Sequence, residues 1–232
     1  MSTLLLRLAA PLQAWGSDSK FERRTTQREP TKSGVIGLLA AALGRERDDS
    51  ITDLCELKFG VRIDQPGQIV KDYHTARLFD VRGKHKHTYV TNRYYISDAV
   101  FLVGLDGNSS LLEEIEAALR FPFFPIFLGR RSCPPTGQLL LGMRDLPLGE
   151  SLEKEEWVAS EWYKKQKKMD RLTLVLDSDV PGANRRRDVP ITFSQTHRQH
   201  TYRCINDMNN KVHVEYQPRI PTEHDPFEEM EE

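Results

Sequence analysis

Apolar and polar residues follow the periods of strands and helices along most of the chain. Residues 3–9 are a nearly continuous apolar run of strand length, which predicts a buried strand that ends before Pro11. The apolar run after residues 31–33 predicts a buried helix that reaches Leu43, with N-cap side chains before it and Gly44 after it.

Three more segments have the apolar pattern of strands, namely residues 59–63, 98–105 and 138–143. Between the last two, apolar spacing predicts an amphipathic helix over 110–120, and Ser110 with Glu113 matches a capping box at its start. In chain order these elements are strand, helix, strand, strand, helix, strand. That is the split βαβ order of ferredoxin-like domains, which include the RNA-recognition fold.

An insertion between the second and third of these strands predicts a projecting β-hairpin over 72–96. Residues 72–80 and 85–96 are strand-like and lie on either side of a turn at Gly83. The insertion is rich in basic and aromatic residues, namely Arg77, Arg82, Lys84, Lys86 and Arg93 with Tyr73, Phe79, Tyr89, Tyr94 and Tyr95.

The pattern is weaker after residue 148. Residues 171–177 predict a strand, and 189–193 and 211–216 are two further candidates, separated by a basic loop at 185–187. We therefore expect an α+β fold with a ferredoxin-like domain over 1–148 and a smaller β-rich C-terminal lobe over 149–222. An acidic tail over 223–232 is expected to be disordered.

The charge balance hides an asymmetry. The 232 residues include 33 Lys and Arg and 34 Asp and Glu, and a net charge of −1 argues against a polybasic nucleic-acid binder. Residues 223–232 hold six of the acidic residues and none of the basic ones, so the rest of the chain carries a net charge of +5. The predicted folded body is mildly basic.

Several classes of protein are disfavoured by the sequence. Three widely separated cysteines fit neither a disulfide framework nor a zinc site of paired cysteines, which favours the reducing cytoplasm. No apolar run approaches the length of about 18 residues that a membrane span needs. The short histidine spacings lack a set of carboxylates or cysteines beside them, so we expect no metal, and no cofactor motif is present.

Two segments are candidates for phosphate binding. The start of the first helix combines Lys32, Ser33 and Gly34 with unsatisfied backbone N–H groups, although ordinary capping and close packing is the favoured interpretation of this stretch alone. The second segment sets Arg130, Arg131 and Ser132 between a glycine and two prolines, as in a stiff loop that presents donors to phosphates. A surface turn whose arginines pair with carboxylates explains it equally well.

The hairpin is the third candidate. Basic residues interleaved with aromatics can neutralise phosphates and stack on bases, and this favours nucleic acid over a lid that packs on its own domain. Tyr73, His74 and the lysines also allow metal-free RNA cleavage, in which a base takes the 2′-OH proton and a cation stabilises the phosphorane. Binding of acidic protein surfaces is a further alternative.

Several of these segments together resemble the CRISPR-associated protein family five, of the repeat-associated mysterious protein superfamily, and in particular its members in type I-E systems. The resemblance covers residues 3–145 in order, and Lys32 stands where that family is expected to have Arg. The later residues match loosely and the acidic tail departs from the pattern. The segments that carry it are 4–16, 21–22, 24–25, 30–34 with 37–39, 72–75 and 128–134.

The resemblance implies an RNA-recognition-like palm with a β-hairpin thumb. It implies a subunit at one end of the Cascade complex that holds the 5′ handle of the CRISPR RNA and contacts the backbone subunit CasC and the large subunit CasA. The thumb would set the boundary between handle and guide, and target DNA would be met only through the assembled complex.

The resemblance also implies binding without catalysis. In type I-C systems the related member cleaves the repeat RNA with Tyr, Lys and His side chains, whereas type I-E systems use a separate subunit. An endoribonuclease for the CRISPR repeat is therefore the alternative function. Carried over to this sequence, the expected RNA-binding residues are Arg23, Arg24, Lys32, Ser33, Gly34, Tyr73, His74, Arg77, Lys84, Lys86, Arg93, Arg130, Arg131 and Ser132, with Trp15 assigned to packing.

Overall fold

The computed structural model describes residues 2–16, 23–180 and 183–216, without the side chains of 169 and 209–211. Its elements mix helices with a largely antiparallel sheet. In chain order they are β1 (Thr3–Gln13), β2 (Arg23–Arg24), α1 (Lys32–Ala42), α2 (Thr52–Glu56), β3 (Lys58–Gln65), β4 (Gln68–Phe79), β5 (His85–Asp106), α3 (Ser109–Arg120), β6 (Leu140–Arg144), α4 (Leu148–Lys154), α5 (Glu161–Lys167), β7 (Met169–Asp177), β8 (Asn184–Thr192) and β9 (Gln199–Glu215).

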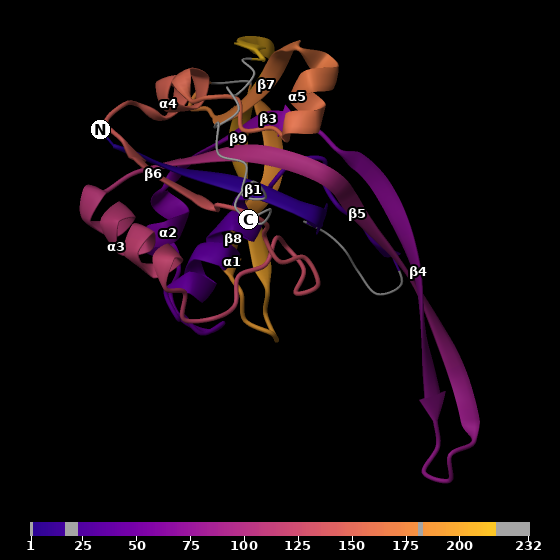
Figure 1. Cartoon of the computed structure of the whole chain (residues 1–232). Helices are drawn as coiled ribbons and strands as arrows, with labels where there is room; N and C mark the ends of the chain where they lie inside the picture. The colour runs from indigo at the N-terminus through magenta and orange to yellow at the C-terminus, as the bar shows by residue number, and fades with distance from the viewer. Residues whose placement is uncertain (1, 17–22, 181–182, 217–232) are drawn as a thin grey trace, which may run out of the picture.

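A single sheet joins all the strands that are described. Its order is β6-β1-β5-β3-β7-β9-β8, and β2 and β4 both pair with β5 off this path (Figure 1). Only β2 pairs in parallel. The long strand β5 therefore pairs with four other strands, namely β1, β2, β3 and β4.

Helices α1 and α3 contribute to the larger core, together with apolar residues of β1, β3 and β5. The predicted start of α1 is confirmed, because Thr31 Oγ1 accepts a hydrogen bond from Gly34 N at 3.2 Å. The predicted capping box of α3 is wrong. Asn108 caps this helix instead, and its side chain accepts from the N–H groups of Ser110 and Leu111, which places Ser110 inside the helix.

Helix α4 packs on a second, smaller core built around leucines of β1, β5 and β7. Gly60 and Gly104 make this approach possible, since a Cβ at either position would lie about 2.6–2.7 Å from α4 leucine side chains. The sequence patterns did not predict α2, α4 or α5.

The three C-terminal strands extend the same sheet. β7 pairs with β3 from Gly60↔Leu176 to Ile63↔Thr173, and β9 and β8 follow beyond it. The basic loop expected at 185–187 is wrong, because these residues belong to β8 and pair with β9, as in Arg186↔Arg203. A domain boundary at 148 stays a prediction, and the acidic tail lies outside the described residues.

Strands β4 and β5 form a long ribbon that projects away from the rest of the protein (Figure 1). Their register runs from Gln68↔Ser97 to Phe79↔His85, and the turn at its end includes Gly83 with φ +77°. Asp80 closes this turn, since its Oδ1 accepts hydrogen bonds from the N–H groups of Arg82 and Lys84 at 2.9 Å each. The hairpin thus lies where the sequence predicts one.

Two negative findings concern the described residues alone. No group of three or more His, Cys, Asp or Glu side chains among them is placed to hold a metal ion. No helix in this part of the chain is both long and apolar enough to cross a membrane.

Candidate nucleic-acid interface

Basic and aromatic side chains from three parts of the chain meet where the hairpin leaves the sheet. β2 lies along one side of β5, with Arg23 opposite Asn92 and Arg24 opposite Arg93, while β4 lies along the other side. The guanidinium carbon of Arg23 lies 5.4 Å from the centre of the Tyr94 ring. This three-strand arrangement brings arginines that are far apart in sequence to the base of the hairpin, where Arg23 lies on the face of the ribbon that carries Tyr94.

The loop after α3 adds Arg130 to this group. Arg130 Nη2 donates to the carbonyl oxygen of Arg24 at 2.9 Å, and its guanidinium carbon lies 4.5 Å from the centre of the Tyr95 ring. Such guanidinium–aromatic contacts orient an arginine without using all of its donors. We call Arg23, Arg24, His74, Arg93, Tyr94, Tyr95 and Arg130 the root cluster.

The backbone of this loop is held rigidly. Leu128 N donates to Cys133 O and Cys133 N donates to Arg130 O, both at 2.8 Å, and the side chains of Leu128 and Cys133 are buried. Burial raises the pKa of the Cys133 thiol, which agrees with a packing role and not a reactive one. Arg131 and Ser132 are exposed at the outer side of the loop.

Gly129 allows a test of how much the loop conformation matters. It has φ +83°, and an added Cβ would collide with the carbonyl oxygen of Ala14. Gly83 has φ +77° but open space around an added Cβ, so Gly83→Ala is the matched control. We expect Gly83→Ala to cost about 1 kcal/mol of unfolding free energy and Gly129→Ala clearly more, measured by urea denaturation. Equal losses would show that the Ala14 contact is unimportant.

Three buried polar atoms at the base of the hairpin have no hydrogen-bond partner in the part of the chain that the structure describes. Arg93 Nε, Arg130 Nη1 and Asn92 Oδ1 are buried and find no hydrogen-bond partner among the described residues. Arg93 Nη2 lies 3.4 Å from His74 Nδ1, a long contact. Because buried donors without partners are costly, these donors of Arg93 and Arg130 are well suited to an anion with several acceptor oxygens, such as a phosphate.

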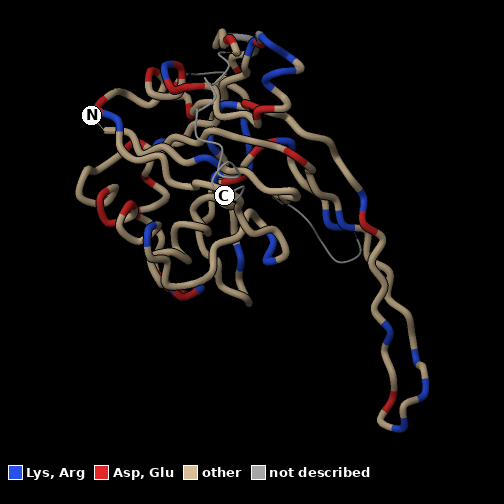
Figure 2. Tube along the Cα trace, in the orientation of Figure 1, with Lys and Arg blue, Asp and Glu red and all other residues tan. Residues whose placement is uncertain are grey.

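The remaining predicted residues of the hairpin lie farther out. Tyr73 is 65% exposed, and Arg77, Lys84 and Lys86 are exposed as well. Figure 2 shows Lys and Arg residues spaced along this ribbon. None of the three cations forms an ion pair within the described part of the chain. They form a basic extension of the root cluster.

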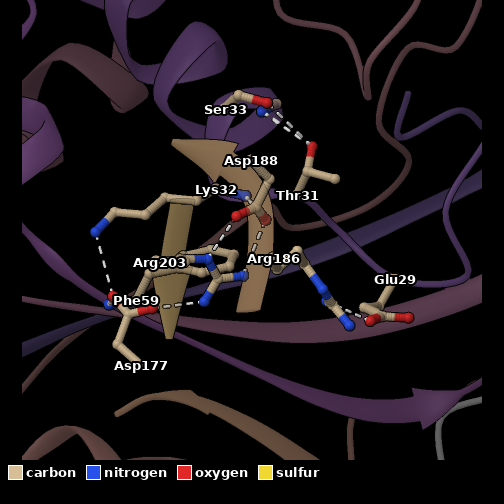
Figure 3. Close-up of polar contacts among 10 residues, drawn as sticks. Glu29, Thr31, Lys32, Ser33, Phe59, Asp177, Arg186, Asp188 and Arg203 are labelled. Carbon is tan, nitrogen blue, oxygen red and sulfur yellow. Dashed lines mark hydrogen bonds and ion pairs between the residues drawn. The ribbon is translucent and has the colours of Figure 1, made fainter. Parts of the chain in front are cut away.

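The start of α1 differs from these surfaces, because its groups already have partners inside the protein. Lys32 is buried, its backbone N donates to Asp188 Oδ2 at 3.1 Å and its Nζ lies 3.2 Å from Asp177 Oδ2 (Figure 3). Ser33 is buried, and a Cβ on Gly34 would lie 2.7 Å from the Trp15 ring. Capping and close packing account for these contacts, and phosphate binding by Lys32, Ser33 and Gly34 stays a prediction.

The sequence did not single out the acidic and basic residues that surround α1. Arg203 donates to both carboxylate oxygens of Asp188, at 2.7 and 2.9 Å, and to Asp177 at 2.5 Å (Figure 3). Burial lowers the pKa of Arg203, but the hydrogen bonds and charges of the two carboxylates outweigh it and raise the pKa overall. No local sequence signal marks these residues, since their partners lie on different strands.

Comparisons with known proteins identify the family of the chain. Residues 3–205 match a protein family described as CRISPR-associated protein (Cas5). The chain is similar to the CRISPR system Cascade subunit CasD of Escherichia coli strain K12, with 42% identity over 158 residues, or 61% of this chain and 70% of that protein.

Two solved structures are similar over nearly the whole chain. One is a chain of a CRISPR RNA-guided surveillance complex, with 31% identity and a TM-score of 0.76 over 92% of this chain and 91% of that one. The other is the crystal structure of a Cas protein, with 36% identity and a TM-score of 0.70 over 93% of this chain and 100% of that one.

Proposed function

Because the chain belongs to the CRISPR-associated protein family five (Cas5), we propose that it is a non-catalytic RNA-binding subunit of a type I-E CRISPR surveillance complex. In this role it holds the 5′ handle of the CRISPR RNA at one end of the complex, in the cytoplasm, for antiviral defence. The root cluster is the observation that carries this proposal, since it combines stacked arginines with buried donors that have no partner among the described residues.

The fold supports an RNA-recognition-like palm. Strands β1, β3, β5 and β6 alternate with α1 and α3 in the order β-α-β-β-α-β of ferredoxin-like domains. In this proposal the β4–β5 hairpin is the thumb, and the root cluster lies between palm and thumb. Arg130, from the loop after α3, connects the two parts through Tyr95 of β5.

The chemistry of the root cluster fits a single-stranded RNA segment. Unpaired bases stack on tyrosine rings and on arginine guanidinium planes, at about 1–3 kcal/mol for each base, while arginines hold the phosphates. The exposed Tyr73 and the basic residues toward the hairpin tip continue this surface beyond the palm. In this proposal they separate the handle from the guide.

The geometry favours binding over cleavage. Tyr73 and His74 are consecutive residues of β4, so their side chains point to opposite faces of the hairpin. They are therefore poorly placed to act on the same 2′-OH and phosphate. If incubation with repeat RNA in EDTA yields one specific product that is lost in His74→Ala, the alternative function of a metal-independent endoribonuclease is correct.

The relatives support a place for this chain in a complex of several subunits. The similar E. coli protein is a Cascade subunit, and one similar solved chain belongs to an RNA-guided surveillance complex. We therefore propose CRISPR RNA, the backbone subunit CasC and the large subunit CasA as partners, with target DNA met through the assembled complex. Co-purification of CRISPR RNA with this chain and both subunits is the expected result.

The double substitution of Arg130 and Arg131 by Ala tests handle binding. We expect affinity for handle RNA to fall about tenfold to a hundredfold in a filter-binding assay at fixed salt, because two charge-assisted contacts are lost. The slope of log affinity against log salt should fall by about 0.7 for each lost phosphate contact.

Arg120→Ala is the control for this experiment. Arg120 is an exposed arginine of α3 whose ion pair with Glu116 lies within the same helix, so its loss removes one charge away from the root cluster. Unchanged affinity and an unchanged salt slope in the double variant, with its thermal unfolding intact, would refute the assignment of this loop to RNA.

A further inference from the structure

A second basic and aromatic surface lies at α5, apart from the root cluster. Residues 161–171 include five basic and two acidic side chains. We call Trp162, Lys165, Lys167, Lys168 and Arg171 the α5 patch. All five side chains are exposed.

Trp162 differs from the other two tryptophans of the chain. It is 57% exposed, whereas Trp15 and Trp157 are 1% and 6% exposed. Its ring packs edge-on against Tyr163 at 5.7 Å, and Tyr163 packs in the same way against the buried Trp157 at 6.1 Å. Trp162 is thus held by the core while more than half of its surface remains accessible to a ligand.

The charges of the patch are not neutralised within the described residues. Glu161 pairs with Lys164 at 3.2 Å, and Asp170 accepts a hydrogen bond from the Tyr163 hydroxyl at 3.4 Å. Lys165, Lys167 and Lys168 form no ion pair in this part of the chain. Lysines in the last turn of α5 stabilise the helix through its dipole. That effect does not explain the exposed Trp162 at the start of the helix or Arg171 beyond its end.

The patch is fixed to the face of the sheet opposite the Arg130 loop. Ser160 donates to Gln65 Oε1 through its N and Oγ, at 3.1 and 2.6 Å, and Trp157 Nε1 donates to Asp64 O at 3.0 Å. Trp157 belongs to a small core with residues of β7 and β9, whereas the Arg130 loop packs on the core of α1 and α3. A strand held at the root cluster therefore lies across the sheet from α5.

We propose that the α5 patch is a second nucleic-acid site, which binds a single-stranded segment by stacking a base on Trp162 and by contacts between the lysines and phosphates. Lysines act as point charges without the forked geometry of arginine, and every base has a face that can stack. The site therefore takes single strands of DNA or RNA without a preferred sequence. It goes beyond the proposed handle binding and does not depend on it.

Tryptophan fluorescence of the full chain tests this site. A short oligo-deoxythymidine strand is expected to quench the emission of the wild type, because Trp162 is the tryptophan that a base can reach, and Trp162→Phe should abolish the quenching. In the triple variant K165Q/K167Q/K168Q, the slope of log affinity against log salt should fall by about 2, or about 0.7 for each lost contact. Oligo-uridine should behave like the DNA strand.

The matched controls separate this site from the root cluster. The tighter binding of handle RNA at the root cluster should be unchanged in the α5 variants, and Arg130→Ala with Arg131→Ala should retain the quenching by oligo-deoxythymidine. The proposal is overturned if Trp162→Phe is quenched like the wild type, if the triple variant keeps its affinity and slope, or if a DNA duplex binds more tightly than the single strand. Because the substituted side chains of the α5 patch are exposed, unchanged thermal unfolding is expected for the α5 variants.

Discussion

Replacement of Asp64 by Ala is expected to lower the free energy of unfolding by about 3–5 kcal/mol. Arg62 and Asp64 are fully buried, with Nε to Oδ1 at 2.7 Å and Nη2 to Oδ2 at 2.8 Å. Arg62 also donates to the carbonyl oxygens of three residues after the start of α4, namely Leu152, Glu155 and Glu156. Without Asp64, a buried guanidinium charge has no carboxylate partner.

Urea unfolding of Asp64→Ala beside Asp179→Ala measures this effect. Asp179 is exposed, so its loss should change stability by no more than about 0.5 kcal/mol. Asp64 also accepts from Val158 N at 2.8 Å, so the variant should loosen the segment that leads to α5. A midpoint equal to that of the control would mean that the buried pair contributes nothing to folding.

A loss of similar size is expected for Asp188→Ala. Asp188 is fully buried, accepts two hydrogen bonds from Arg203 and also accepts from the backbone N of Lys32. Its removal leaves Arg203 with Asp177 alone and leaves the N–H at the start of α1 without its acceptor. Both changes weaken the attachment of α1 to β8 and β9, at a cost of about 3–5 kcal/mol.

Two further variants make this measurement specific. Asp188→Asn keeps the shape and one acceptor but removes the charge, so its stability should lie between those of the wild type and Asp188→Ala. Asp207→Ala on β9 is the control, since that carboxylate is exposed. If Asp188→Asn and Asp188→Ala were both as stable as the control, the carboxylate would not be what anchors α1.

The sequence predicts the elements that local patterns determine. The first strand, the first helix and β5 have long apolar runs, and the hairpin has a turn glycine between two strand-like segments. Helices α4 and α5 have seven residues each and no side-chain cap hydrogen bond, so neither apolar period nor capping could mark them. The run of arginines at 185–187 is typical of a loop, but charged residues are also common in edge strands, and β8 is the last strand of the sheet.

The candidate site was predicted residue by residue but not as a cluster. Arg23, Arg93 and Arg130 each belong to segments that the sequence singled out, yet their proximity depends on pairing between distant strands. The same limit hides the partner of Lys32, since Asp177 is 145 residues away. A cation whose counter-ion lies so far along the chain looks free to bind phosphate.

The continuity of β5 gives the hairpin a mechanical property. One strand of 22 residues runs from the turn at the tip into the centre of the sheet, where its last residues pair with β1 and β3. Asp98 is the one described residue of β5 with a positive φ, at +53°. The hairpin is therefore attached rigidly to the sheet through the continuous backbone of β5. A force on the tip of the hairpin is transmitted along this backbone to the core. A partner that binds the tip therefore also fixes the orientation of the whole subunit.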